Sequence, residues 1–141
     1  MGGADGGSVG LLGVCGGCEY VSSTTGETVF SNFYPGSGAD TSQPVKAFVY
    51  DNPMQTFIIA ADASLTDEAT ARAATFANAD FSDGAAGSTS TGLSSGKLAV
   101  STIAATAAHH LRIMGILDDV ENSDFSAAGI PLIVRLNNSF N

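Results

Sequence analysis

The segment IPLIVRL at residues 130–136 carries the clearest signal of the fold. Leu132, Val134 and Leu136 alternate with other residues, so in a strand they share one face. Strict alternation of this kind is typical of a strand with one buried face. The segment therefore predicts a β-strand that closes the fold, and the rest of the chain can be interpreted outward from it.

The segment LRIMGI at residues 111–116 shows the same alternation. Arg112 lies between Leu111 and Ile113, so the charged side chain would face away from the two apolar ones. A second strand with one buried face is therefore predicted here, and residues 97–103 form a weaker strand candidate before it.

Three further strands are predicted in the first half of the chain, at residues 28–34, 46–50 and 55–60. All are rich in β-branched and aromatic residues. The last two are separated by Asp-Asn-Pro at residues 51–53, a turn signal. We therefore expect 46–50 and 55–60 to pair as a hairpin.

One helix is predicted, at about residues 66–77. The segment SLTDE at residues 64–68 resembles a helix start, because Ser64 or Thr66 could cap it and the acids suit its positive end. Apolar residues then recur at helical spacing and would form its buried face: Leu65, Ala69, Ala73 and Phe76.

These elements predict a mainly β protein, a small single-domain β-barrel or sandwich with one short helix and long loops. Closure is favoured because it hides sheet edges. We expect residues 1–141 to form one domain, with residues 1–10 as a flexible or partner-docked arm. Residues 81–96 form a long polar loop, which in a compact domain is usually disordered or bound to something.

The composition argues for protein partners. Hydrophobic residues make up 44% of the chain and charged residues only 13%, about half the usual share. Interface cores are depleted of charge in this way. The net charge of −9, from 14 acids and 5 bases, disfavours nucleic acid and anionic membranes. No stretch approaches the roughly 20 apolar residues of a membrane helix, and the first residues do not resemble a secretory signal.

The CGGC motif at residues 15–18 allows four interpretations. It could be a redox dithiol, half of a zinc site, a disulfide, or two small apolar thiols in a bulged strand. Its flanks resemble a strand, and Glu19 beside it would raise a thiol pKa, whereas redox motifs usually begin a helix. A zinc site needs four ligands, and only His109 and His110 remain. The bulged strand is the favoured interpretation.

The other polar clusters predict no catalysis. His109 and His110 have no nucleophile context, and neighbours at the entry of a strand would point to opposite faces. The acidic loop at residues 118–126 lacks calcium-loop spacing and is interpreted as solvated. We expect no enzymatic activity, no catalytic or metal-binding residues and no cofactor.

Several segments, taken in order, resemble a family of tailed-bacteriophage structural proteins. The carboxyl-terminal part has GSTSTGLS at residues 87–94, STIA at 101–104, LRIMG at 111–115, an acidic-Asn turn at 118–122 and VRLNN at 134–138. Earlier segments also fit: GCEYVSSTTGETVFSNFYPG and KAFVYDNPMQTFIIAADA. The resemblance covers residues 16–138, with departures at Asn52, where the family has Asp, and after Asn138, where its terminal His is absent.

The resemblance implies a head-decoration (cement) protein on the virion capsid surface. Its partners would be the major capsid protein and further copies of itself, with a trimer as one option. Contacts would come from the amino-terminal arm and the 81–96 loop, with these anchors: Phe30, Phe33, Tyr34, Leu93 and Phe140. Phe30 and Tyr34 would share one strand face. The alternatives are a tail or neck component, or a small CxxC thiol or metal-binding domain.

Overall fold

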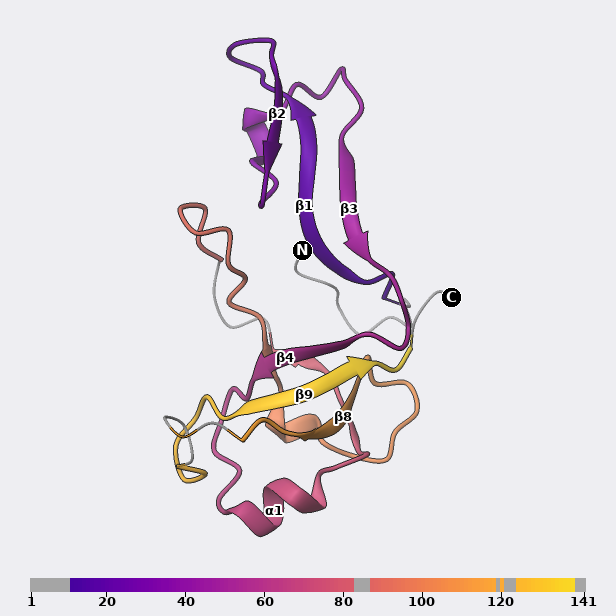
Figure 1. Cartoon of the computed structure of the whole chain (residues 1–141), viewed down its shortest axis with the longest axis vertical. Coiled ribbons are helices and arrows are strands. Elements are labelled where there is room, and N and C mark those ends of the chain that lie inside the picture. Colours follow the sequence, from indigo (N-terminus) through magenta and orange to yellow (C-terminus); the bar gives the residue numbers. More distant parts are fainter. Residues whose placement is uncertain (1–10, 83–86, 119, 121–123, 139–141) are drawn as a thin grey trace.

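A computed structural model describes residues 11–82, 87–118, 120 and 124–138 (Figure 1). The chain folds into three antiparallel sheets with one short α-helix, so the mainly β prediction is confirmed. Of the two forms predicted, a barrel or a sandwich, the described residues form no closed barrel. The end strands of each sheet do not join, and the two larger sheets lie toward opposite ends of the molecule's long axis (Figure 1).

The four-stranded sheet has the order β4-β9-β8-β5. Its strands are β4 (Thr56–Ala60), β9 (Pro131–Leu136), β8 (Leu111–Ile116) and β5 (Asn78–Ala79). The strands predicted at 111–116 and 130–136 are confirmed. Their alternating apolar side chains are all buried: Leu111, Ile113, Leu132, Val134 and Leu136. Burial of one face of each strand fixes the register, since a slip by one residue would expose every one of them.

The hydrophobic core lies between this sheet, the helix α1 (Glu68–Ala73) and the 3₁₀ turn η2 (Val100–Thr102). Ile130 and Leu98 are fully buried in it, and Ala71 and Ala74 supply the contact from the helix side. Almost all of the core cluster therefore comes from residues after the first 55.

The helix is shorter than predicted and buries a different face. Asp67 caps it by accepting a hydrogen bond of 2.7 Å from the Thr70 N–H, so the predicted caps Ser64 and Thr66 are wrong. Thr66 has a positive φ of 70°, which places Leu65 outside the helix and breaks the predicted spacing. Consequently three of the four predicted face residues do not belong to a buried helical face and are exposed: Ala69, Ala73 and Phe76.

A small third sheet joins β6 (Phe81–Ser82) to β7 (Lys97–Leu98). The strand predicted at 97–103 is right only for its first two residues. The chain then turns into η2, where the Thr102 hydroxyl donates to the Ala99 carbonyl at 2.7 Å.

The three-stranded sheet has the order β2-β1-β3, from β2 (Thr28–Ser31), β1 (Val14–Val21) and β3 (Lys46–Tyr50). The CGGC motif lies within β1, and the register with β3 shifts between Cys15 and Gly17. The bulged-strand interpretation of residues 15–18 is confirmed.

The predicted hairpin between 46–50 and 55–60 is wrong, because β3 pairs with β1 and β4 pairs with β9. Around Asn52 the chain does turn, with the Gln55 N–H donating to its carbonyl at 3.0 Å. That turn carries the chain from one sheet into the other (Figure 1). The strand predicted at 28–34 also ends early, at Ser31, and a 3₁₀ turn η1 (Gly36–Gly38) follows it.

Candidate protein-binding face

The register of the three-stranded sheet places four large apolar side chains on one of its faces. Residues directly opposite each other in an antiparallel pair point to the same side. Val14 is opposite Tyr50, and Gly17 is opposite Phe48. On the other edge, Glu19 is opposite Phe30. We call this the aromatic face, defined by Val14, Phe30, Phe48 and Tyr50.

The aromatic face is open to solvent. Phe30 is 70% exposed, Tyr50 62%, Phe48 49% and Val14 38%. Single exposed apolar residues are ordinary on protein surfaces, but a contiguous group on one sheet face is typical of an interaction site. The geometry therefore fits contact with another protein chain.

A groove of about 340 Å³ lies on this face, with Gly16 and Gly17 below and Phe30 and Phe48 beside it. Gly17 has φ +146°, and a Cβ there would approach the Ser31 carbonyl oxygen to 2.9 Å. Glycine suits this position, because a side chain would be strained by the positive φ and would crowd the Ser31 carbonyl. The groove can accept one apolar side chain of a partner between two aromatic rings.

The aromatic face is nearly neutral. Its one pair of charges is Glu19 and Lys46, whose Nζ and Oε1 atoms lie 3.0 Å apart. The ammonium is mostly exposed, so the pair adds little stability, but it leaves no net charge beside the groove. The strong net charge of the chain, −9, is therefore not expressed on this face, where Lys46 balances Glu19.

The structure brings two of the predicted anchor regions together. Leu93, 70% exposed, lies on a loop that reaches the end of β2, where the Asn32 side chain donates to the Thr91 carbonyl at 2.9 Å. Gly92, with φ +71°, lies so close to Asn32 that a Cβ would overlap its amide. Leu93 and Phe30 thus belong to neighbouring parts of the surface.

The remaining predicted anchors differ in position. Tyr34 is 54% exposed but follows the end of β2, so it does not share a strand face with Phe30 as predicted. Phe33 is half-buried, and Phe140 lies outside the described residues. Sequence reasoning missed Phe48 and Tyr50. Their alternation with Ala47 and Val49 was visible, but it was assigned to the wrong hairpin.

The two cysteines are paired with Val49 and Ala47, which alternate with the aromatic-face residues of β3, and Cys18 also lines the groove. Cys15 is exposed and Cys18 is buried, and both are free thiols. Burial and the neighbouring Cys15 raise the pKa of the Cys18 thiol. Its Sγ lies 3.1 Å from the Phe33 carbonyl oxygen, to which it donates. A reactive thiolate needs a lowered pKa, so this arrangement favours a packing role for Cys18.

A second polar group is formed by Asp80, His109 and His110. The His110 ring nitrogen Nδ1 donates to Asp80 Oδ1 at 2.8 Å, and His109 Nδ1 lies 2.8 Å from Oδ2. Both histidines precede β8, so the expectation that they point to opposite faces is wrong. Partial burial alone would raise the pKa of Asp80, but the hydrogen bonds from His110 and the nearby histidine charges hold it below its usual 3.8.

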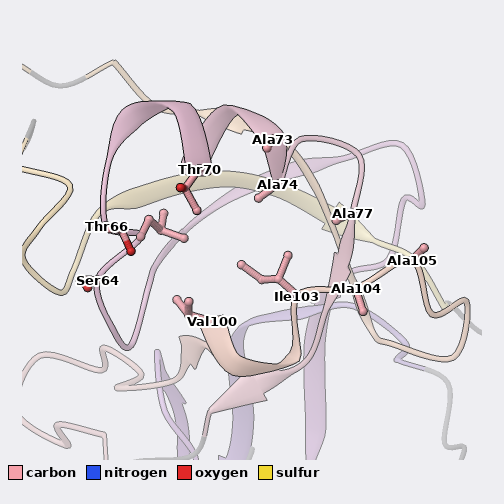
Figure 2. Close-up of a pocket in the computed structure, with 11 residues that line it drawn as sticks. Ser64, Thr66, Thr70, Ala73, Ala74, Ala77, Val100, Ile103, Ala104 and Ala105 are labelled. Carbon is pink, nitrogen blue, oxygen red and sulfur yellow. The ribbon is translucent and has the colours of Figure 1, made fainter.

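A pocket lies between α1 and η2 (Figure 2). It measures about 430 Å³, and Val100 and Ile103 point from η2 toward the helix. Its lining is apolar and hydroxyl-bearing, without an acid, a base or a thiol. Such a pocket can hold an apolar group but offers no acid–base chemistry.

Comparison with known protein families, curated proteins and solved structures found no match. In the part of the chain that the structure describes, no group of three His, Cys, Asp or Glu residues could hold a metal ion. No helix in that part is long and apolar enough to span a membrane. The aromatic face is therefore the feature on which a function can be argued.

Proposed function

We propose that this chain is a structural protein of a tailed-phage virion that binds the outer capsid surface and stabilises contacts between major capsid subunits. The role is binding rather than catalysis. The aromatic face is the observation that carries the proposal, because it is apolar, neutral and open. The sequence resemblance at residues 16–138 supplies the class of partner.

Binding through this face would follow the pattern of other protein interfaces. A few buried aromatic anchors usually supply most of the affinity, within a contact of roughly 1,600 Å². Phe30 and Phe48 would be the anchors, since they flank the groove and are largely exposed in the free chain. Each bound copy then stabilises the assembled state by mass action.

A decoration role also needs repetition. Identical sites recur over an icosahedral lattice, so a modest affinity per copy adds up over the shell. The low share of charge, 13%, suits a protein whose surface is largely covered by neighbours.

The test uses capsids of the source phage assembled without this chain. Purified chain is added back, and bound copies are quantified after sedimentation. The double variant Phe30→Ser and Phe48→Ser should bind about 30-fold more weakly, which corresponds to the binding free energy of a single hot-spot residue. Phe76→Ser is the matched control, because Phe76 is 61% exposed but lies after α1, far from the three-stranded sheet in the fold.

Cryo-electron microscopy of the refilled capsids then gives the position of each copy. Hundreds of copies bridging major capsid subunits through the aromatic face would support the proposal. Copies confined to a tail or neck, or unchanged binding by the double variant, would reject it. A variant that lacks residues 1–10, tested in parallel, measures how much of the capsid affinity comes from the predicted amino-terminal arm.

A further inference from the structure

The strand β3 forms an open edge of the three-stranded sheet. Within the described ranges, only β1 pairs with it. The other candidate edges are less open: β7 comes beside the end of β4 through the Ala61–Leu98 bridge, and the loop at Thr91 binds the end of β2. Every second residue of β3 therefore directs its N–H and C=O away from β1, and no other strand among the described residues pairs with them.

Nothing in β3 blocks pairing with another strand. Natural edge strands usually carry an inward charge, a proline or a bulge. The sequence KAFVY has no proline, and the bulge of this sheet lies in β1. Its one charge, Lys46, is at the first position and is neutralised by Glu19. Such an edge is a template for strand addition.

We propose that β3 pairs antiparallel with β3 of a second copy, centred on Phe48, to form a six-stranded sheet. This register overlaps all five residues, more than any other symmetric register. Phe48 lies opposite the partner's Phe48, and Ala47 lies opposite the partner's Val49.

The charges favour this register. Lys46 lies opposite the partner's Tyr50 on the same face, so an ammonium group meets an aromatic ring and not another base. Asp51, the first acid beyond the strand, faces the partner's Val45. The remaining repulsion comes from the net charge of −9 on each copy. Salt screens it, so dimerisation strengthens as ionic strength rises.

The pairing also joins the two aromatic faces. Opposite residues of an antiparallel pair point to the same side, so both copies present Phe30, Phe48 and Tyr50 in one direction. The dimer then offers two grooves to one surface, which raises the effective concentration of the second contact. This consequence rests on the proposed function, whereas the pairing itself does not.

Disulfide trapping tests the register on the purified full-length chain. All variants carry Cys15→Ser and Cys18→Ser, because these native thiols lie opposite Val49 and Ala47 in the same chain and could bridge to a cysteine placed there. Phe48→Cys should form a covalent dimer on mild oxidation, because directly opposite Cα atoms are about 4.5–5.5 Å apart, within disulfide range. Ala47→Cys and Val49→Cys are the matched controls. Each should stay monomeric alone, but an equimolar mixture of the two should form the mixed dimer.

Sedimentation equilibrium supplies the second measurement. The unmodified chain should show a dimer that tightens between low and moderate salt. Phe48→Lys places two lysines opposite each other, and this variant should be monomeric with an unchanged circular dichroism spectrum. A monomeric or trimeric unmodified chain, or trapping by Ala47→Cys alone, overturns the pairing. A trapped dimer that does not bind capsids keeps the pairing and rejects the proposed function.

Discussion

Gly17 shows how one residue shapes both the sheet and its groove. It has φ +146° at the bulge, and a side chain there would meet the Ser31 carbonyl oxygen. We expect Gly17→Ala to lower the free energy of unfolding by about 2 kcal/mol, since it adds a steric clash to the strain of a positive φ. Urea titration can follow this by tyrosine fluorescence, because all three tyrosines lie between residues 20 and 50.

Gly26 is the matched control for this substitution. It also has a positive φ, of 71°, but no atom lies within 4 Å of a Cβ built there. Gly26→Ala should therefore lose only the backbone contribution, about 1 kcal/mol. Equal losses in the two variants would show that the contact with Ser31 contributes nothing.

Asp80 makes the stability of the fold depend on pH in the acidic range. Its pKa is lowered in the folded chain, so its contribution to stability is fully present above the unfolded value of 3.8. The contribution is lost as pH falls through the still lower folded pKa. Asp80→Asn should be less stable than the unmodified chain at pH 6, and the gap should narrow below pH 3.8. Thermal melts at several pH values measure the gap.

Other carboxylates with lowered pKa values, such as Asp67, also destabilise the chain in acid. They are the same in both proteins, so only the difference between the two pH curves reports on Asp80. If the difference in stability between Asp80→Asn and the unmodified chain stays constant down to pH 2, the charge of the Asp80 carboxylate does not contribute to that difference.

At the scale of elements, the sequence predicted strands well where burial on one face imposes alternation. Leu111, Ile113 and Val134 are buried as the pattern indicated. It failed where pairing depends on distant residues. The turn at Asn52 exists, but β3 pairs with β1, the strand with the bulge at Gly17, and not with β4.

The candidate site was accessible to sequence reasoning only in part. Phe30 was predicted as an aromatic of a strand, and Leu93 lies in the long loop predicted to make contacts; both are exposed. Phe48 and Tyr50 were missed, because alternation shows that they share a face but does not show that this face stays uncovered once β3 pairs with β1. The Asp80 cluster was also missed, because His109 and His110 meet a carboxylate about 30 residues away.

At the scale of the whole molecule, apolar burial is unevenly divided. The core cluster gathers around β8 and β9, whereas the three-stranded sheet contributes none of its members. Among the described residues of that sheet and its connections, Cys18 and Ala39 are the buried apolar side chains. A three-stranded sheet needs a covered apolar face for independent stability. Its stability should therefore depend on what covers or extends it.

Hydrogen exchange would show this division directly. In dilute solution we expect amides of β8 and β9 to exchange at least 100-fold more slowly than those of β1 and β3, because local opening of a sheet with few buried contacts costs less free energy. Raising the protein concentration should protect β3 selectively, as the free edge becomes paired. Phe48→Lys should not show that gain. Equal protection of both sheets in dilute solution would mean that the three-stranded sheet is stable by itself and that its exposed aromatic face needs no partner for folding.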